Sequence, residues 1–368
     1  MELPLRSEAV PTGGSANAVA NPQSGAKMLS LQRTTRVLLL AVVLGLCDQN
    51  YWQYSNVDRY FAGYWMPYVR GIGAAPEQYR IGVKMAAWWL VQHLSWGFRY
   101  GFTLMDLGAS TVGVLLVYDL LLRRTVIRSA PTALQWFAST GFMMLVCYYM
   151  AWVGFFFRPE TLPSFGVTAC MVWLWTGPRG KREGTLLTVI GLLAAAATQA
   201  WIRADIPCAL NGGIFLACMV GSGRGLSISR RASIMTSLAC IGVAAGTQLY
   251  IMRGLYPHAT YEGIPVIMLS RDLHQPLTLP PFLIFMLPVA WTGFQACRQR
   301  YVLNTGDRGL IFGAVIYLIL WVVLGKLDEV RIFIPFAMAL IPITMELAVR
   351  RIAGPGEIAA IVPDGVEV

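Results

Sequence analysis

Residues 36–52 read RVLLLAVVLGLCDQNYW, an apolar run that begins at Arg36 and is closed by Asp48, Gln49 and Asn50. Similar runs of about 16 to 22 residues, commonly followed by basic residues, recur along the chain and are typical of membrane helices. Of the 368 residues, 56% are hydrophobic and 13% are charged, whereas soluble domains carry about 25% charged residues. The sequence therefore predicts an all-α, polytopic transmembrane protein with about ten spans. It excludes a soluble enzyme, a coiled coil and a disulfide scaffold.

Ten predicted spans separate the loops into two groups. The spans are 36–52, 102–122, 132–157, 162–177, 184–202, 206–221, 232–252, 278–297, 310–324 and 332–349. With these crossings, 18 of the 29 basic residues lie on the side that holds both chain ends. Because cytoplasmic loops are enriched in Lys and Arg, we expect both termini in the cytoplasm. The net charge of +10 then follows from topology and does not indicate a nucleic-acid partner.

Residues 31–351 form a single predicted transmembrane domain. Residues 1–30 are rich in Gly, Pro, Ser and Asn and predict a disordered cytoplasmic tail, and residues 352–368 predict a C-terminal cytoplasmic tail. The seven cysteines lie within or beside apolar runs, so we interpret them as small packing residues and not as metal ligands. His258 and His274 have no standard zinc-ligand spacing, and no metal or other cofactor is predicted.

Whether the segment 81–99 crosses the membrane decides on which side every later loop lies. It is apolar enough to cross a membrane, but Arg80, Lys84, Gln92, Ser95 and Arg99 share one helical face. Such a helix favours the membrane interface. If it crossed, most arginine clusters would lie outside. We therefore predict one long external loop, residues 49–101, with embedded amphipathic helices.

Polar chemistry collects on the predicted outer side. Four arginines there lie beside membrane segments: Arg80, Arg203, Arg271 and Arg331. Arg203 is two residues from Asp205, and Arg331 is two residues from Glu329. Each arginine fits either a structural ion pair or a contact to a phosphate group, which a guanidinium binds through paired donors.

Two outer acids are candidate proton acceptors. Asp48 directly follows an apolar run, where a carboxylate is costly unless it is paired or reaches water. It is either a general base or a solvated aspartate at a helix end, and Asp58 is the second candidate. Few ionisable residues fall deep inside the spans, which disfavours an ion-coupled transporter.

Several of these features together resemble the GT-C superfamily of integral-membrane glycosyltransferases. They are the acid at the outer end of span one, the long external loop, the pair Tyr79 and Arg80, and a late G-x-x-x-E-x-R-x-x-x-P element at Gly325, Glu329, Arg331 and Pro335. The resemblance implies transfer of a hexose such as mannose from a polyprenyl-phosphate-linked sugar to an acceptor on the outer side. It implies that Asp48 or Asp58 is catalytic. Many members have two adjacent acids where this chain has Asp48 and Gln49, so no metal site is carried over.

The function predicted from the sequence is thus a cell-envelope glycosyltransferase in a plasma membrane such as the bacterial inner membrane. Its expected partners are the polyprenyl-phosphate-sugar and membrane lipids. The predicted lipid-phosphate-binding residues are Arg80, Arg203, Asp205, Arg271, Glu329 and Arg331. A transporter or flippase for a lipid-linked or amphiphilic substrate is the alternative, and a polysaccharide polymerase is a neighbouring enzyme class. The two halves of the chain show no internal repeat, which a transporter often has.

Overall fold

The computed structural model describes residues 22–61, 63–155, 158–177, 182–259, 267–275, 277 and 279–361. Within these ranges the chain is helical and has no strand, which confirms the predicted all-α class. Ten of the described helices have 16 residues or more: α1 (Pro22–Tyr60), α4 (Phe98–Leu122), α6 (Thr132–Phe155), α7 (Thr161–Thr176), α8 (Arg182–Arg203), α9 (Asp205–Val220), α10 (Arg230–Leu249), α12 (Leu279–Arg298), α13 (Thr305–Leu324) and α14 (Ile334–Ile361).

Eight of these ten helices are long and apolar enough to cross a membrane. The other two, α7 and α9, have 16 residues each, which cover about 24 Å against a hydrocarbon core of about 30 Å. Each predicted span overlaps one of the ten helices. The chain is therefore built as an integral membrane protein.

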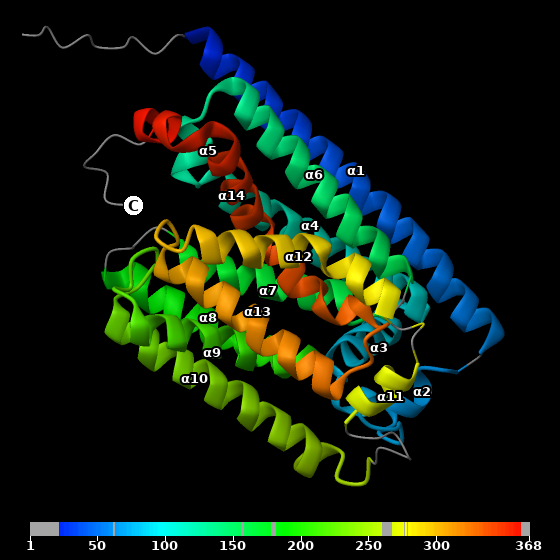
Figure 1. Cartoon of the computed structure of the whole chain (residues 1–368). Helices are drawn as coiled ribbons and strands as arrows, with labels where there is room; N and C mark the ends of the chain where they lie inside the picture. Colours follow the sequence, from blue (N-terminus) through cyan, green and yellow to red (C-terminus); the bar gives the residue numbers. More distant parts are fainter. Residues whose placement is uncertain are drawn as a thin grey trace, which may run out of the picture.

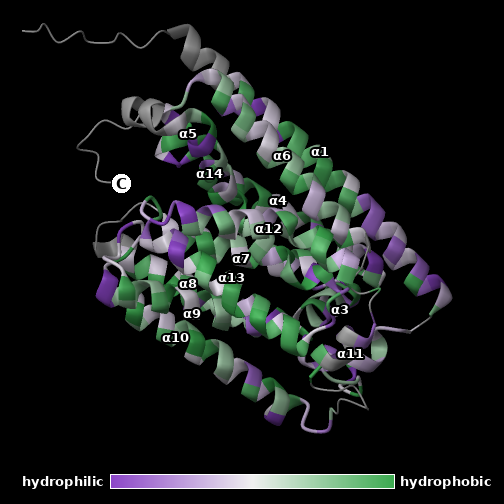
Figure 2. Ribbon diagram, in the orientation of Figure 1, coloured by the Kyte–Doolittle hydropathy of each residue, from purple (hydrophilic) through white to green (hydrophobic). Residues whose placement is uncertain are grey.

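The short helices lie at the two ends of the bundle (Figure 1). One end, which we call the α3 end, holds α2 (Met66–Val69), the 3₁₀ helix η1 (Glu77–Tyr79), α3 (Gly82–Leu94) and α11 (Leu269–His274). The opposite α5 end holds α5 (Thr125–Ser129) and the last turns of α14. Apolar residues run along the long helices, and hydrophilic residues concentrate toward the ends (Figure 2). This distribution is expected when the middle of each helix faces lipid or other helices.

Helix α14 forms the centre of the bundle. A 3₁₀ turn, η4 (Val330–Phe333), leads into it, and 89% of the most apolar part of Val330–Gly354 is buried within the protein. It packs against α4, α6, α7, α12 and α13. A helix that is apolar on all sides can be enclosed in this way. Gly354, at φ 72°, interrupts its helical geometry.

Helix α1 lies along one edge beside α4 and α6 (Figure 1). Its buried positions, Leu39, Val43, Leu46, Asn50 and Tyr54, recur every three or four residues and so form one helical face. The helix begins at Pro22 and ends at Tyr60. It therefore includes the end of the predicted N-terminal tail and the beginning of the predicted external loop.

Helix α3 covers most of the segment 81–99, for which we predicted a helix that does not cross the membrane. It has 13 residues, or about 20 Å, and is not among the helices able to cross a membrane. It packs against α4 and α8. The expectation that its polar face lies at the membrane interface is wrong for Lys84, whose side chain is fully buried in the protein. The lysine can be buried because it forms an ion pair with the Glu160 carboxylate, which precedes α7.

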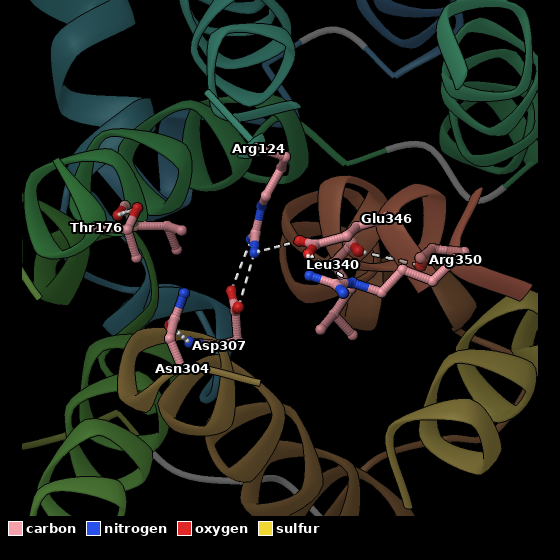
Figure 3. A network of polar contacts seen from close by, with 9 residues as sticks. Arg124, Thr176, Asn304, Asp307, Leu340, Glu346 and Arg350 are labelled. Atoms are coloured by element: carbon pink, nitrogen blue, oxygen red, sulfur yellow. Dashed lines mark hydrogen bonds and ion pairs between the residues drawn. The ribbon is translucent and has the colours of Figure 1, made fainter. Parts of the chain in front are cut away.

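An ion-pair network at the α5 end joins α13 and α14 to the residue that precedes α5 (Figure 3). Arg124 lies between Asp307 at the start of α13, at 2.7 Å, and Glu346 of α14, at 3.0 Å. Arg350 also binds Glu346, at 2.8 Å. In the sequence, Arg124 is only one of the basic residues that follow the predicted span 102–122. In the structure it closes one end of the bundle, and two arginines are matched by two acids.

Helices α9 and α13 pack closely through glycine residues. A Cβ atom at Gly213 of α9 would overlap the Gly313 nitrogen and the Gly309 carbonyl oxygen of α13. At the neighbouring Gly212, a Cβ atom would meet only the Ile316 Cδ1 atom, at 3.6 Å. The first glycine is therefore required by packing and the second is not.

We expect Gly213→Ala to lower the melting temperature of the purified protein by about 3 °C or more, because the added methyl group forces the two backbones apart. Gly212→Ala is the matched control and should melt at or slightly above the wild-type temperature, since alanine favours a helix. Equal melting temperatures of the two variants would contradict this packing.

Candidate anion-binding site

Nine charged side chains gather at the α3 end, and we call them the ion cluster. They come from four connections between helices: residues 77–84, 158–160, 203–205 and 329–331. The members are Glu77, Arg80, Lys84, Arg158, Glu160, Arg203, Asp205, Glu329 and Arg331. Five are basic and four are acidic. The cluster therefore has one positive charge more than its acids neutralise.

The pair Lys84–Glu160 is the most buried part of the ion cluster. The ammonium lies 2.5 Å from the carboxylate, and the two side chains are 1% and 7% exposed. Lys84 also donates to the Glu77 and Arg80 carbonyl oxygens, at 3.4 Å each, and lies over the Tyr68 ring. Burial alone would favour the neutral acid, but Lys84, assisted by Arg331 and Arg80, lowers the pKa of Glu160 to about 2. Glu160 is thus an ion-pair partner and unsuited to accept a proton.

Arg203 and Asp205 form a two-point pair at the junction of α8 and α9. The Arg203 Nη2 and Nε atoms donate to the Asp205 carboxylate at 2.7 Å and 3.3 Å. The Tyr317 hydroxyl donates to the same carboxylate at 3.2 Å, and its ring faces Arg203 with 5.8 Å to the centroid. These contacts attach α13 to the α8–α9 junction.

Two further pairs complete the paired part of the ion cluster. Arg158 binds Glu77 at 2.6 Å, with both side chains partly exposed. Arg331, which is buried, binds Glu329 at 2.9 Å. Arg331 is also close enough to Glu160 and Arg203 to affect them electrostatically. The connection before α14 is therefore joined to the other three.

Arg80 differs from the other four cations. It is partly buried and lies within electrostatic range of Glu160 and Asp205. Its guanidinium nevertheless has no ion pair or hydrogen bond with any described residue. The acids near it are already bound by Lys84 and Arg203.

The structure thus brings together five of the predicted site residues, namely Arg80, Arg203, Asp205, Glu329 and Arg331. The side chain of Arg271 lies outside the described part of the chain. Sequence reasoning missed Lys84, Glu77, Arg158 and Glu160. Their signal was weak, because each lies in a different loop from its partner or in a segment assigned to the membrane surface.

The two predicted catalytic acids lie outside the ion cluster. Asp48 is exposed and lies within α1, well before the helix ends at Tyr60. It lies on the same helical face as Leu44 and Trp52, which are 57% and 61% exposed. Asp58 is half-buried near the C-terminal end of α1, beside Arg99 and Trp65.

A third acid, Asp106, is buried between α1 and α4. Its carboxylate accepts hydrogen bonds from the Asn50 amide and the Tyr54 hydroxyl, at 2.8 Å each. The predicted span 102–122 would put Asp106 within about one turn of its end, and this prediction is wrong, because α4 begins earlier, at Phe98. Asp106 is within electrostatic range of Glu160. Asp106 thus lies near the ion cluster, but no described hydrogen bond or ion pair joins it to the cluster.

No group of three or more His, Cys, Asp or Glu side chains in the described ranges is arranged to hold a metal ion. The arrangement of the ion cluster suits an anion, because arginine and lysine donors outnumber the carboxylates. Comparison with protein-family models, curated proteins and solved structures finds no match to this chain.

Breaking the buried pair should destabilise the protein far more than breaking an exposed one. Glu160→Gln leaves the Lys84 ammonium buried without a counter-ion, which costs about 3–5 kcal/mol. Glu77→Gln is the matched control, since its pair with Arg158 is partly exposed and is expected to contribute about 1 kcal/mol or less. Melting curves in one detergent measure both, and similar losses would contradict the burial of the Lys84–Glu160 pair.

The same pair predicts a pH dependence. Because the pKa of Glu160 falls from 4.5 to about 2, its stabilisation is fully present above about pH 4.5 and is lost as the pH decreases toward 2. Glu160→Gln should lack this part of the acid response.

Proposed function

We propose that this protein is an integral-membrane glycosyltransferase that moves a sugar from a polyprenyl-phosphate-linked donor to an acceptor on the outer side of the membrane. The observation that carries the proposal is the ion cluster, in which four separate connections place five cations and four acids at one end of the bundle. A lipid-linked phosphate approaches such a site from the membrane. Donors held in a partly buried site stabilise a phosphate more strongly than they do in water.

The proposed orientation is ten crossings with both termini in the cytoplasm. It places the α3 end outside and the α5 end inside. The positive-inside distribution of 18 among 29 basic residues supports it. The ion pairs support it as well, because residues 77–84, 158–160, 203–205 and 329–331 meet at one end, as an even alternation of ten helices requires. In this orientation the ion cluster faces the periplasmic or exoplasmic side.

The proposed reaction is a displacement at the anomeric carbon. The acceptor hydroxyl oxygen forms a bond to this carbon, and the bond from the carbon to the phosphate oxygen breaks. The phosphate leaves with the bonding electron pair, and the hydroxyl proton passes to a carboxylate. Cations of the ion cluster stabilise the negative charge that develops on the departing phosphate.

Asp58 is the better candidate for the proton acceptor. It is half-buried, whereas Asp48 is exposed beside Leu44 and Trp52. Ring contacts lead from Trp65 beside Asp58 to Tyr64 and on to Tyr68, which faces Lys84. Asp58 thus adjoins a row of aromatic side chains that ends at the ion cluster. Such rings offer apolar faces on which a sugar can stack.

A transporter or flippase for a lipid-linked substrate is the second candidate. Asp106 favours it, because a buried carboxyl group more than two turns inside α4 is the kind of group that proton-coupled transporters use. A polysaccharide polymerase would use the same outer cations.

Topology is tested by cysteine labelling with a membrane-impermeant maleimide on intact cells. Ile72→Cys at the α3 end should be labelled, and Tyr301→Cys at the α5 end should react only after the membrane is opened. Both positions are strongly exposed, at 74% and 79%. Wild-type protein controls for the seven native cysteines. Labelling at 301 and not at 72 in intact cells would reverse the orientation and contradict an outer active site.

Catalysis is tested in membranes of the native host, supplied with a panel of radiolabelled polyprenyl-phosphate-linked sugars. We expect Asp58→Asn to lower sugar transfer by about 10² to 10⁴, the loss typical of a general base. Transfer reduced by Asp48→Asn and not by Asp58→Asn would return the role to Asp48. If wild-type protein transfers no sugar and instead moves the lipid across vesicles, the flippase is correct and the transferase is not.

A further inference from the structure

Arg80 is held in place through its backbone. It follows η1 directly, and its amide donates to the Glu77 carbonyl oxygen at 3.2 Å while its own carbonyl accepts from Lys84 at 3.4 Å. The preceding Tyr79 donates its hydroxyl to the Ala259 carbonyl oxygen at 2.8 Å. The following residue, Ile81, is fully buried. The backbone is thus fixed on both sides of Arg80, while the guanidinium has no hydrogen-bond or ion-pair partner among the described residues.

Within the ion cluster, the charges other than that of Arg80 are balanced. The other four cations of the ion cluster each bind one acid: Lys84 with Glu160, Arg158 with Glu77, Arg203 with Asp205 and Arg331 with Glu329. At the α5 end, Arg124 and Arg350 are likewise matched by Asp307 and Glu346. Of these two networks of ion pairs, only the ion cluster at the α3 end contains a cation without an acid partner.

We infer that Arg80 is the direct contact for the ligand's phosphate, and that the site takes a lipid carrying a single negative charge, a phosphodiester. This inference rests on the proposed function and narrows it. A phosphodiester neutralises the one surplus cation. A diphosphate would bring further negative charge beside Glu160 and Asp205, with no free cation to balance it.

The paired cations have a different role. Removing Arg203 or Arg331 leaves an acid without its partner, so such variants lose stability whether or not they contact a ligand. Arg80→Gln breaks no internal pair and should melt close to the wild-type temperature. Arg80 is thus the cation of the ion cluster at which binding can be separated from folding.

The experiment measures binding of defined lipids to purified full-length protein in a neutral detergent. The probes are farnesyl methyl phosphate, with one charge, farnesyl diphosphate, and phosphatidylglycerol, a singly charged phosphodiester of a different lipid. The variants are Arg80→Gln, Arg80→Lys and the control Arg70→Gln. Arg70 belongs to the same segment, is exposed, and its side chain forms no ion pair or hydrogen bond with a described residue.

We expect wild-type protein and Arg70→Gln to bind farnesyl methyl phosphate equally. Arg80→Gln should bind it roughly 10 to 100 times more weakly, the loss typical of a hydrogen bond between charged groups. Arg80→Lys should show an intermediate loss, because an ammonium cannot hold two phosphate oxygens in one plane. Farnesyl diphosphate should bind no more tightly than the diester.

Several results would overturn the inference. If the Arg80→Gln variant binds farnesyl methyl phosphate as tightly as wild-type protein does, Arg80 is not a contact for the phosphate. The inference also fails if wild-type protein binds none of the three probes. If farnesyl diphosphate binds tenfold more tightly than farnesyl methyl phosphate, the inference that the ligand carries a single negative charge is refuted. If phosphatidylglycerol binds as tightly as farnesyl methyl phosphate and with the same dependence on Arg80, the contact between Arg80 and a phosphodiester is supported. The ligand is then a phospholipid, which contradicts a polyprenyl-phosphate-linked sugar as the ligand. If the protein binds farnesyl methyl phosphate through Arg80 but transfers no sugar, the proposed function is refuted and the inference about Arg80 stands.

Discussion

The buried ion pair between Lys84 and Glu160 is the interaction on which the α3 end depends. Neither charge can be buried alone, because an ion that leaves water loses several kcal/mol of hydration. At 2.5 Å, each satisfies the other. Lys84 belongs to α3, and Glu160 immediately precedes α7. Their pairing fixes α3 against α7, and Lys84 also donates to the carbonyl oxygens of Glu77, the first residue of η1, and of Arg80, which follows η1.

The arrangement of charges differs between the two ends of the bundle. At the α5 end, Arg124 bridges Asp307 and Glu346, and the network is neutral (Figure 3). At the α3 end, the same kind of pairing leaves Arg80 without an acid partner among the described residues. Paired residues hold helices together, while an unpaired and half-buried cation has binding capacity for an anion. This contrast is the physical reason for placing the proposed phosphate site at the α3 end.

The sequence was sufficient for the fold class and for part of the site. Apolar runs predicted the ten long helices because the membrane requires such runs. Parity of the loops then grouped Arg80, Arg203 and Arg331 on one side, and the structure brings them together. Side-chain burial was not predictable in the same way. Asp48 and Asn50 are two residues apart, yet one is exposed and the other is buried, because packing of α1 against its neighbours selects the face.

Lys84 shows the same limit. Its position on a polar helical face predicted a surface, since helical periodicity carries no information about a carboxylate 76 residues later in the chain. Asp106 was misplaced because α4 begins earlier than its apolar run suggests. Both errors concern ionisable groups whose cost of burial is offset by a partner from a distant segment. Such pairs require the tertiary structure.

The central claim is that Arg80 presents an unpaired cation to a lipid phosphate within the ion cluster. The most direct measurement is a cryo-electron microscopy map of the protein in a lipid nanodisc containing farnesyl methyl phosphate. The account predicts phosphate density about 4 Å from the Arg80 guanidinium carbon, with Lys84 still bound to Glu160. A map in which Arg80 is paired with Glu160 or Asp205, and the phosphate lies elsewhere, would contradict it.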